Sequence, residues 1–314
     1  MQTRIIEFLK NSDGYLSGEE ISRKLNISRA GIWKNMQELR KKGYSIEAVP
    51  HKGYVLKSAP DKLFPQEITS ELQTKYIGQN LVHYDSIGST MDEAFKFAMD
   101  ECVEGTVVCA EEQAKGRGRM GRDWSSTISK GIYTSIVLKP NLVATDVAKL
   151  TLLTGVAVYE AVKKVSDIGI SIKWPNDLMV GDKKLCGILT EMNAQMEQVK
   201  FVIVGIGINV NHTKNELLPE AVSIKTETGE EISRVKLLRE ILISLEYWYE
   251  LMLDQGFDPV IKKWKEYTST LNRRIRLNEI EGKAIDLDEF GGLVIETDDG
   301  MVVKRMSGDV MELN

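Results

Sequence analysis

Residues 106–139 read TVVCAEEQAKGRGRMGRDWSSTISKGIYTSIVLK, and this stretch decides the fold of the central part of the chain. Two apolar segments, 106–113 and 132–139, have strand composition and flank the sequence GRGRMGR at 116–122. GRGRMGR matches the dinucleotide fingerprint G-x-G-x-x-G, but that fingerprint must open a helix after a strand. The residues that follow it have turn chemistry and lead into another strand. The stretch therefore predicts a strand–loop–strand unit and excludes a Rossmann nucleotide fold.

The loop at 116–122 combines conformational freedom with positive charge. Its three glycines allow close backbone approach, and Arg117, Arg119 and Arg122 carry guanidinium groups that stay charged. Such a loop suits an anion, for example a triphosphate, a pyrophosphate or an acyl phosphate. The alternative is a solvated, mobile basic loop without a ligand, and other segments of the chain decide between the two.

The length of 314 residues predicts two or three domains. No apolar run approaches the ~18 residues of a membrane span, and the N-terminal residues do not read as a signal peptide. Cys102, Cys109 and Cys186 form no C-x-x-C pair, so we expect free thiols in a reducing cytoplasm. The three histidines are scattered, and no metal site is expected.

The net charge of −5 is unevenly distributed along the chain. Residues 1–60 carry 11 Lys+Arg and 6 Asp+Glu, a balance of +5, whereas residues 61–314 carry 30 and 40, a balance of −10. A basic N-terminal segment on an acidic body predicts that nucleic acid contacts only the N-terminus.

Residues 1–60 have the pattern of a winged helix-turn-helix. Amphipathic helices are expected at 3–10, from Ser17 with its capping-box partner Glu20, and from Ser28 to about residue 41. Strands at 44–49 and 52–56 then form the wing, and residues 58–61 a linker. The solvent face favours DNA over a protein-interaction module. The expected DNA contacts are Ser28, Arg29, Ala30, Lys34, Gln37, His51 and Lys52.

Strands alternate with helices over residues 61–270. A capping box at Thr90 and Glu93 predicts a helix to about residue 103, and long helices are expected at 147–165, 234–255 and 258–267. Ser89 and Thr90 at a helix start are available to a polar ligand, or simply cap the helix. The aromatic residues of the last two helices are expected in the core: Tyr247, Trp248, Tyr249 and Trp264.

Two further segments carry polar residues and glycines into the predicted sheet. Residues 170–180, ISIKWPNDLMV, read as one strand, and 183–191, KKLCGILTE, as the returning strand. This hairpin would bring Lys173, Asn176, Asp177 and Lys184 to one end of the sheet. Residues 201–211, FVIVGIGINVN, form a third strand, in which Gly205 and Gly207 allow either a flat ligand or tight packing against the backbone.

Three motifs in this order, GRGRMGR, KWPND followed by KKLCGIL, and GIGIN, resemble the bifunctional bacterial biotin protein ligases, which are also biotin operon repressors. The resemblance covers essentially the whole chain. It implies an α/β, multi-domain (α+β) fold with a winged helix-turn-helix at 1–60, a central mixed sheet flanked by helices at 64–270, and an SH3-like β barrel at 271–314. Evenly spaced short strands in the last region agree with a barrel, which could also be a purely structural cap.

The resemblance also implies a two-step reaction. Biotin attacks the α-phosphate of ATP, with Mg²⁺, to give biotinyl-5′-AMP and pyrophosphate. A lysine of biotin carboxyl carrier protein then takes the biotinyl group. Operator DNA and a homodimer promoted by biotinyl-AMP are the other implied partners, and no membrane is involved.

The family motifs transfer to residues of this chain one by one. The implied catalytic residues are Lys184, Arg119, Arg122 and Asp177. The implied biotin-binding residues are Ser89, Thr90, Gln113, Gly116, Arg117, Gly118, Arg119, Lys184, Gly187 and Leu189. The implied ATP or adenylate contacts are Arg119, Arg122, Trp124, Asn176, Lys184 and Asn209.

Two alternatives remain open at this point. A repressor that senses biotin without ligating it would have the same N-terminal region, but the full set of cations argues against it. A lipoate ligase would share the central fold, and GRGRMGR together with KWPND and KKLCG favours biotin.

Overall fold

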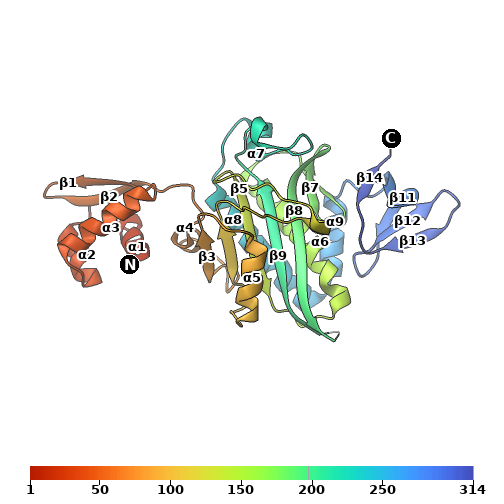
Figure 1. Cartoon of the computed structure of the whole chain (residues 1–314), viewed down its shortest axis with the longest axis horizontal. Coiled ribbons are helices and arrows are strands. Elements are labelled where there is room, and N and C mark those ends of the chain that lie inside the picture. Colours follow the sequence, from red (N-terminus) through yellow and green to blue (C-terminus); the bar gives the residue numbers. More distant parts are fainter. Residues whose placement is uncertain (197, 314) are drawn as a thin grey trace.

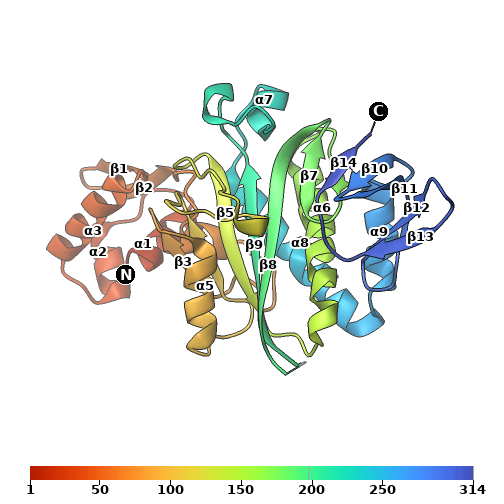
Figure 2. The same ribbon diagram turned by 45° about the vertical axis from the view of Figure 1, so that its right-hand side comes forward.

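The computed structural model describes residues 1–196 and 198–313, and its elements form three groups along the chain (Figure 1). A small helical group with a two-stranded hairpin lies at one end, and a small sheet lies at the other. Between them is a large sheet with helices, and the short helix α7 (Ile224–Thr228) rises above one end of it (Figure 2).

The N-terminal group is the predicted winged helix-turn-helix. Ser17 Oγ accepts a hydrogen bond from the Glu20 amide and Ser28 Oγ from the Gly31 amide, so each serine caps the helix that follows. Apolar side chains at helical spacing, such as Ile21 and Met36, are fully buried in a core of their own. The elements are α1 (Gln2–Lys10), α2 (Gly18–Leu25), α3 (Arg29–Lys41), β1 (Ser45–Val49) and β2 (Gly53–Ser58).

The chain after the hairpin is bound to both neighbouring groups and is not a free linker. Phe64 packs in the core of the N-terminal group. Tyr44 Oη donates a hydrogen bond to Glu67 Oε1 at 2.9 Å, and Lys10 Nζ lies 2.7 Å from Glu67 Oε2. Contacts just beyond the expected linker at 58–61 therefore hold the N-terminal group against the body.

A buried ion pair fixes the same segment to the central sheet. Arg234 and Glu111 have side chains only 1% exposed and lie 2.8 Å apart, and Arg234 also pairs with Asp61. Burial favours a raised pKa for Glu111, but its hydrogen bond from His83 and the charge of Arg234 outweigh this and hold the pKa at about 2. Glu111 thus stays ionised and keeps its partners.

A mixed sheet forms the centre of the molecule, with the strand order β3-β4-β5-β9-β8-β7-β6. The β3–β4 pair is parallel and the other pairs are antiparallel. The strands are β3 (Leu81–Tyr84), β4 (Val107–Ala110), β5 (Gly131–Leu138), β6 (Ser171–Lys173), β7 (Asp177–Val180), β8 (Lys183–Gln195) and β9 (Gln198–Asn209).

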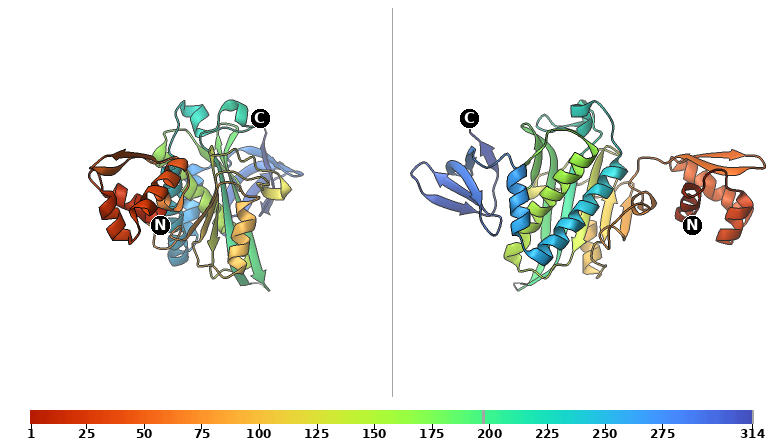
Figure 3. Two further views of the ribbon diagram at one scale, coloured as in Figure 1. Left: turned by 60° about the vertical axis from the view of Figure 1, so that its left-hand side comes forward. Right: turned by 180° about the vertical axis from the view of Figure 1, so that it is seen from behind.

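Helices cover the two faces of this sheet unequally. Seen from behind, α6 (Val147–Val165), α8 (Arg234–Gln255) and α9 (Asp258–Tyr267) lie across one face (Figure 3). On the other face, α5 (Thr90–Met99) packs over β4, β5 and β9. This helix leaves the end of β8 and β9 uncovered, which is where loops can enclose a ligand. The remaining helical turns are α4 (Pro65–Thr69), η1 (Arg119–Gly121), η2 (Ala144–Asp146) and η3 (Lys214–Glu216).

Residues 170–180 do not form the single strand that was expected. They form β6 and β7, which pair antiparallel with each other, and the chain reverses at the cis peptide between Trp174 and Pro175. β6 is the edge strand of the sheet. A proline within a strand pattern can mark the end of one strand as well as an edge position. The chain reversal at Pro175 was missed because apolar residues on both sides of it continue the strand pattern.

Three expectations about helices are also wrong. The N-cap of α5 is Ser89 rather than Thr90, and the Glu93 carboxylate binds Tyr84 and Lys96 instead of closing a capping box. The helix ends at Met99 because Asp100 leaves helical geometry. Among the four aromatics placed in the core, Tyr247 is 59% exposed, whereas the other three are buried.

The C-terminal region is a five-stranded antiparallel sheet with the order β13-β12-β11-β10-β14. It confirms the predicted small β-domain. The last strand was not predicted, because it is three residues long and buries only Val310. The strands are β10 (Arg274–Leu277), β11 (Ile280–Leu287), β12 (Leu293–Thr297), β13 (Val302–Arg305) and β14 (Val310–Glu312). None of the described helices has the length and apolar character needed to cross a bilayer.

Candidate active site

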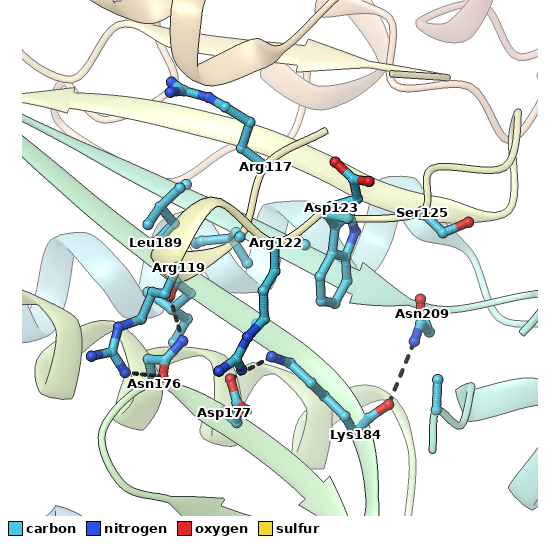
Figure 4. Close-up of a pocket in the computed structure, with 18 of the residues that line it drawn as sticks. Arg117, Arg119, Arg122, Asp123, Ser125, Asn176, Asp177, Lys184, Leu189 and Asn209 are labelled. Carbon is cyan, nitrogen blue, oxygen red and sulfur yellow. Dashed lines mark hydrogen bonds and ion pairs between the residues drawn. The ribbon is translucent and has the colours of Figure 1, made fainter. Parts of the chain in front are cut away.

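One pocket lies over the uncovered end of β8 and β9, beneath the loop that contains GRGRMGR (Figure 4). Segments far apart in the sequence meet there: the start of α5, the loop, β7, β8, β9, the segment 209–221 and one residue of the C-terminal sheet. Most residues expected in a site line it: Thr90, Gln113, Arg117, Gly118, Arg119, Arg122, Trp124, Asn176, Asp177, Lys184, Gly187, Leu189 and Asn209. Ser89 and Gly116 lie next to lining residues but do not line the pocket themselves.

The backbone of Lys184 is held on both sides. Its amide donates to Glu220 O at 2.8 Å, and its carbonyl accepts from the Val222 amide at 3.0 Å. On the other edge of β8, Lys184 pairs with Met179 of β7. These contacts fix the root of the side chain, so the ammonium group enters the pocket from a defined position. Lys173, which was expected nearby, lies on the edge strand β6 and does not line the pocket.

Cations and their partners converge at the end of β7. Lys184 Nζ lies 2.7 Å from Asp177 Oδ1, although the angles of this pair are not those of a hydrogen bond. Arg119 Nη1 donates to Asn176 Oδ1 at 2.9 Å. Burial lowers the pKa of Arg119, and the like charge of Arg122 adds to this, against the favourable influence of Asp177. The cluster would therefore be stabilised by an added anion.

The other two arginines of the loop pair with carboxylates from other parts of the chain. Figure 4 shows Arg117 pointing away from Asp177, and its guanidinium pairs with Asp92 at 2.7 Å and Glu191 at 3.3 Å. These pairs attach the loop to the first turn of α5 and to β8. Arg122 forms an ion pair with Asp309 of the C-terminal sheet. The loop is thus held in place by charges from three parts of the chain.

The glycines of β8 and β9 make room for side chains of the chain itself. A Cβ atom at Gly207 would lie 2.5 Å from Cε2 of Trp124, and one at Gly187 would lie 2.8 Å from Cζ3 of the same indole. At Gly205 the neighbour is the sulfur of Met91, at 2.5 Å. The flat group that the glycines accommodate in this structure is therefore the Trp124 indole, and Lys184 Nζ lies 5.5 Å from the centroid of its ring.

The end of the pocket near α5 is neutral and polar. Gln113 Oε1 accepts hydrogen bonds from the Thr90 amide at 2.8 Å and from Thr90 Oγ1 at 3.0 Å. Gln113 Nε2 donates to Ser126 Oγ at 3.0 Å, and Ser135 Oγ donates to Thr90 Oγ1 at 2.8 Å. This network fixes amide and hydroxyl groups that suit an uncharged polar ligand group.

Several lining residues were not expected from the sequence. The segment after GIGIN contributes His212, Leu217 and Ala221 to the pocket, and the polar run NVNH was its only signal. Burial lowers the pKa of His212 to about 4, so its ring is neutral at pH 7. Asp309 could not have been found, because nothing near it in the sequence suggests a site.

Buried polar atoms without a hydrogen-bond partner gather around the pocket. Among the described residues there are five such side-chain atoms. Three of them have no ion-pair partner either and belong to residues in or beside the pocket: Ser89 Oγ, Trp124 Nε1 and His212 Nδ1. Buried polar groups are rarely left unpaired unless a ligand or water completes them. The pocket is therefore built to receive a ligand with polar groups.

The N-terminal group presents a second candidate surface. Arg29, Ala30 and Lys34 are exposed on α3, and His51 and Lys52 are exposed at the turn of the hairpin. Ser28 is exposed and caps α3, while Gln37 is half-buried. The predicted contacts therefore lie on α3 and on the tip of the wing, the two elements with which winged helices contact DNA.

Comparison with known proteins identifies the family. The chain is 38% identical over 311 residues to the "Bifunctional ligase/repressor BirA" of Bacillus subtilis (strain 168), an alignment that covers 96% of this chain and 95% of the relative. The chain belongs to the biotin protein ligase family. The protein of the same name from Escherichia coli (strain K12) is 29% identical, over 98% of this chain and 95% of the relative.

Family models and a solved structure agree with this family. The model "Biotin/lipoate A/B protein ligase family" matches residues 84–209, "HTH domain" matches 2–55, and "Biotin protein ligase C terminal domain" matches 270–311. The structure "Biotin protein ligase from Aquifex aeolicus in complex with biotin and ATP" superposes with a TM-score of 0.63 at 31% identity. It covers 75% of this chain and 99% of that protein.

Proposed function

We propose that this protein activates biotin with ATP and transfers it to a lysine of biotin carboxyl carrier protein. The observation that carries the proposal is the convergence of Arg119, Arg122 and Lys184, from two distant segments, on one pocket with a neutral polar end. Two anions, a carboxylate and a triphosphate, can approach each other only where fixed cations reduce their repulsion. The pocket supplies both the cations and a separate place for an uncharged ring.

In the proposed first step, a carboxylate oxygen of biotin attacks the α-phosphorus of ATP. The bond from the α-phosphorus to the bridging oxygen of pyrophosphate breaks, and pyrophosphate leaves with its electron pair. Lys184 would contact the biotin carboxylate and the bridging phosphate, and Asp177 would orient the Lys184 ammonium group at 2.7 Å. Arg119 and Arg122 would take up the charge that develops on the phosphate oxygens. In the second step, the amine of the carrier lysine attacks the acyl carbon and AMP leaves.

The polar end of the pocket would hold the fused ring of biotin. Ser89, Thr90 and Gln113 offer hydroxyl and amide groups of the kind that bind its ureido group. Trp124, Gly187 and Leu189 would form the apolar wall beside it, and Gly116 and Gly118 would let the loop approach. Arg117 would contribute by anchoring that loop through Asp92 and Glu191.

The nucleotide would occupy the opposite part of the pocket, beside Asn176 and Asn209. Mg²⁺ would enter as Mg·ATP, because no group of three or more His, Cys, Asp or Glu in the described part of the chain could hold a metal ion by itself. Mg²⁺ commonly binds through phosphate oxygens and water with one or two carboxylates, and Asp177 is available for that role. Bound in this way, Mg²⁺ would neutralise charge on the triphosphate.

We also propose that the N-terminal group binds operator DNA as part of a homodimer promoted by biotinyl-AMP. One recognition helix buries little DNA surface, and specific sites usually pair two such groups on half-sites. Ordering of the loop around biotinyl-AMP would supply the ligand dependence, since an interface that includes an ordered loop forms at a smaller entropic cost. The functional borders would be 1–60, 64–270 and 271–314.

The ligase proposal is tested by incubating the protein with Mg·ATP and a mixture of biotin, lipoate and octanoate, followed by identification of the acyl adenylate. Biotinyl-AMP and an equal amount of pyrophosphate are the expected products. Lipoyl-AMP or octanoyl-AMP would make the protein a lipoate-type ligase. Binding of biotin without release of pyrophosphate would leave a repressor that only senses biotin.

The repressor proposal is tested by titrating operator DNA with and without biotin plus ATP while sedimentation follows the oligomeric state. We expect both additions together to tighten dimerisation and DNA binding, and unbiotinylated carrier protein to reverse both. Equal affinity in the two conditions would remove the coupling.

A further inference from the structure

Lys184, Arg119 and Arg122, the three cations of the proposed reaction, already have partners in this structure, and two of these partners are carboxylates. Lys184 pairs with Asp177 at 2.7 Å and Arg122 pairs with Asp309, whereas Arg119 binds the neutral Asn176 amide. Asp177 lies in the same sheet as Lys184 and next to it in space. Asp309 differs, because it comes from another group of the fold and is separated from Arg122 by 187 residues.

Asp309 is the residue through which the C-terminal sheet lines the pocket. It lies in the turn between β13 and β14, directly after Gly308, whose φ of 146° favours glycine. The side chains of Arg122 and Asp309 are 61% and 42% exposed, so water reaches the pair and either partner can be exchanged. A negative charge beside a pocket for two anionic substrates is unfavourable unless a cation compensates it.

A carboxylate and a phosphate bind a guanidinium group in the same way, through paired N–H···O contacts. A triphosphate carries several negative charges, so it attracts Arg122 more strongly than one carboxylate does. It also repels Asp309 if both remain at the same cation. A nucleotide phosphate that reaches Arg122 therefore competes with Asp309 for it.

We propose that Asp309 is the resting counter-ion of Arg122 and that a phosphate of the nucleotide takes its place. This inference rests on the proposed ligase function. Asp309 is then a positioning residue that holds Arg122 at the pocket before ATP arrives. When pyrophosphate leaves, Asp309 recaptures Arg122 and favours release of the product.

The test compares the full-length protein with the variants Asp309→Asn and Asp298→Asn. Asp298 also forms an exposed ion pair in the C-terminal sheet, with Arg274, but it does not line the pocket. The assay measures the half-saturating concentrations of Mg·ATP and of biotin in adenylate formation, and the inhibition constant of pyrophosphate. Thermal denaturation of each variant checks that the fold is kept.

We expect Asp309→Asn to lower the half-saturating Mg·ATP concentration and the inhibition constant of pyrophosphate by about two- to fivefold, the range for loss of a competing exposed ion pair. The half-saturating concentration of biotin should not change in Asp309→Asn, and none of the three constants should change in Asp298→Asn. In an Arg122→Ala background, Asp309→Asn should have no effect on either constant, because the two substitutions act on one pair.

An unchanged or raised half-saturating Mg·ATP concentration in Asp309→Asn overturns the inference. A decrease of the same size when Asp309→Asn is made in the Arg122→Ala background also overturns it. A shift in the biotin value of the same size would mean that the substitution disturbs the pocket as a whole, which also contradicts it. Absence of adenylate formation in the parent protein would instead refute the proposed function.

Discussion

Replacing Gly207 with alanine tests whether the Trp124 indole is seated on the sheet beneath the pocket. The added Cβ would meet three indole atoms at 2.5, 2.7 and 2.8 Å, all shorter than an ordinary contact of 3.4 Å or more. The indole must therefore retreat by about 1 Å, since the strand around Gly207 is paired on both sides and cannot move easily. Overpacking of this kind destabilises a protein by about 1–3 kcal/mol.

The shift should also reach the reacting groups, because Lys184 Nζ lies 5.5 Å from the indole centroid. Misplacement by about 1 Å can cost up to about 100-fold in rate. We therefore expect Gly207→Ala to slow adenylate formation by roughly 10- to 100-fold, measured as pyrophosphate release, and to lower the melting temperature. Gly155→Ala is the matched control, because its Cβ would have no neighbour nearer than 3.6 Å.

The decisive comparison repeats Gly207→Ala in a Trp124→Ala background. Without the indole the new methyl group has space, so the second substitution should cost little further stability. Such a difference between backgrounds is the signature of two residues in direct contact. An equal loss of melting temperature with and without Trp124 would refute the packing of the indole on Gly207.

Other predictions concern charge, retention of the intermediate, pH and DNA. Lys184→Ala should slow adenylate formation by ~100-fold or more, the scale of a lost transition-state donor; near-normal pyrophosphate release from the folded variant would remove Lys184 from the mechanism. Arg119→Ala should release biotinyl-AMP and label lysines of bystander proteins, and selectivity equal to that of the parent would show that the loop does not retain the intermediate. The pKa of His212 is about 4 in the folded protein and 6.5 in an unfolded chain, so as the pH falls from 6.5 to 4 the unfolded state binds a proton that the folded state does not, and stability is lost. The melting temperature of His212→Gln should therefore fall less steeply over that pH range than that of the parent. Parallel curves for the two proteins would contradict this. Lys34→Gln should reduce the salt dependence of operator binding by about one unit of slope per N-terminal group, or about two for the dimer, whereas an equal loss in Lys262→Gln, an exposed lysine of α9, would place the DNA elsewhere.

Local signals in the sequence were sufficient for much of the fold. Ser17 and Ser28 cap helices because a hydroxyl three residues before an amide needs no distant partner. The loop, β5 and the long helices likewise follow from composition and spacing. Asn176 and Asp177 of KWPND could be placed near Lys184 because a short hairpin connects them, even though the strand break at Pro175 was missed and Lys173 lies away from the pocket.

Features that depend on distant parts of the chain could not be predicted in the same way. Phe64 was placed at the start of the central domain, but it packs in the N-terminal core, close to the hydrogen bond between Tyr44 and Glu67. The glycines of β9 do not reveal that Trp124 covers them. Asp309 enters the pocket only because the C-terminal sheet packs beside it. Each case depends on which surfaces meet in three dimensions, and no local pattern records that.

The central claim, that this pocket activates biotin for transfer to a protein lysine, is tested most directly by mass spectrometry of a purified biotin carboxyl carrier protein. The carrier would be incubated with this protein, biotin and Mg·ATP, beside a carrier whose acceptor lysine is replaced by arginine. We predict the mass gain of one biotinyl group on the unaltered carrier only, and none when ATP is omitted. An unchanged carrier mass, or a gain that does not require ATP, would contradict the claim.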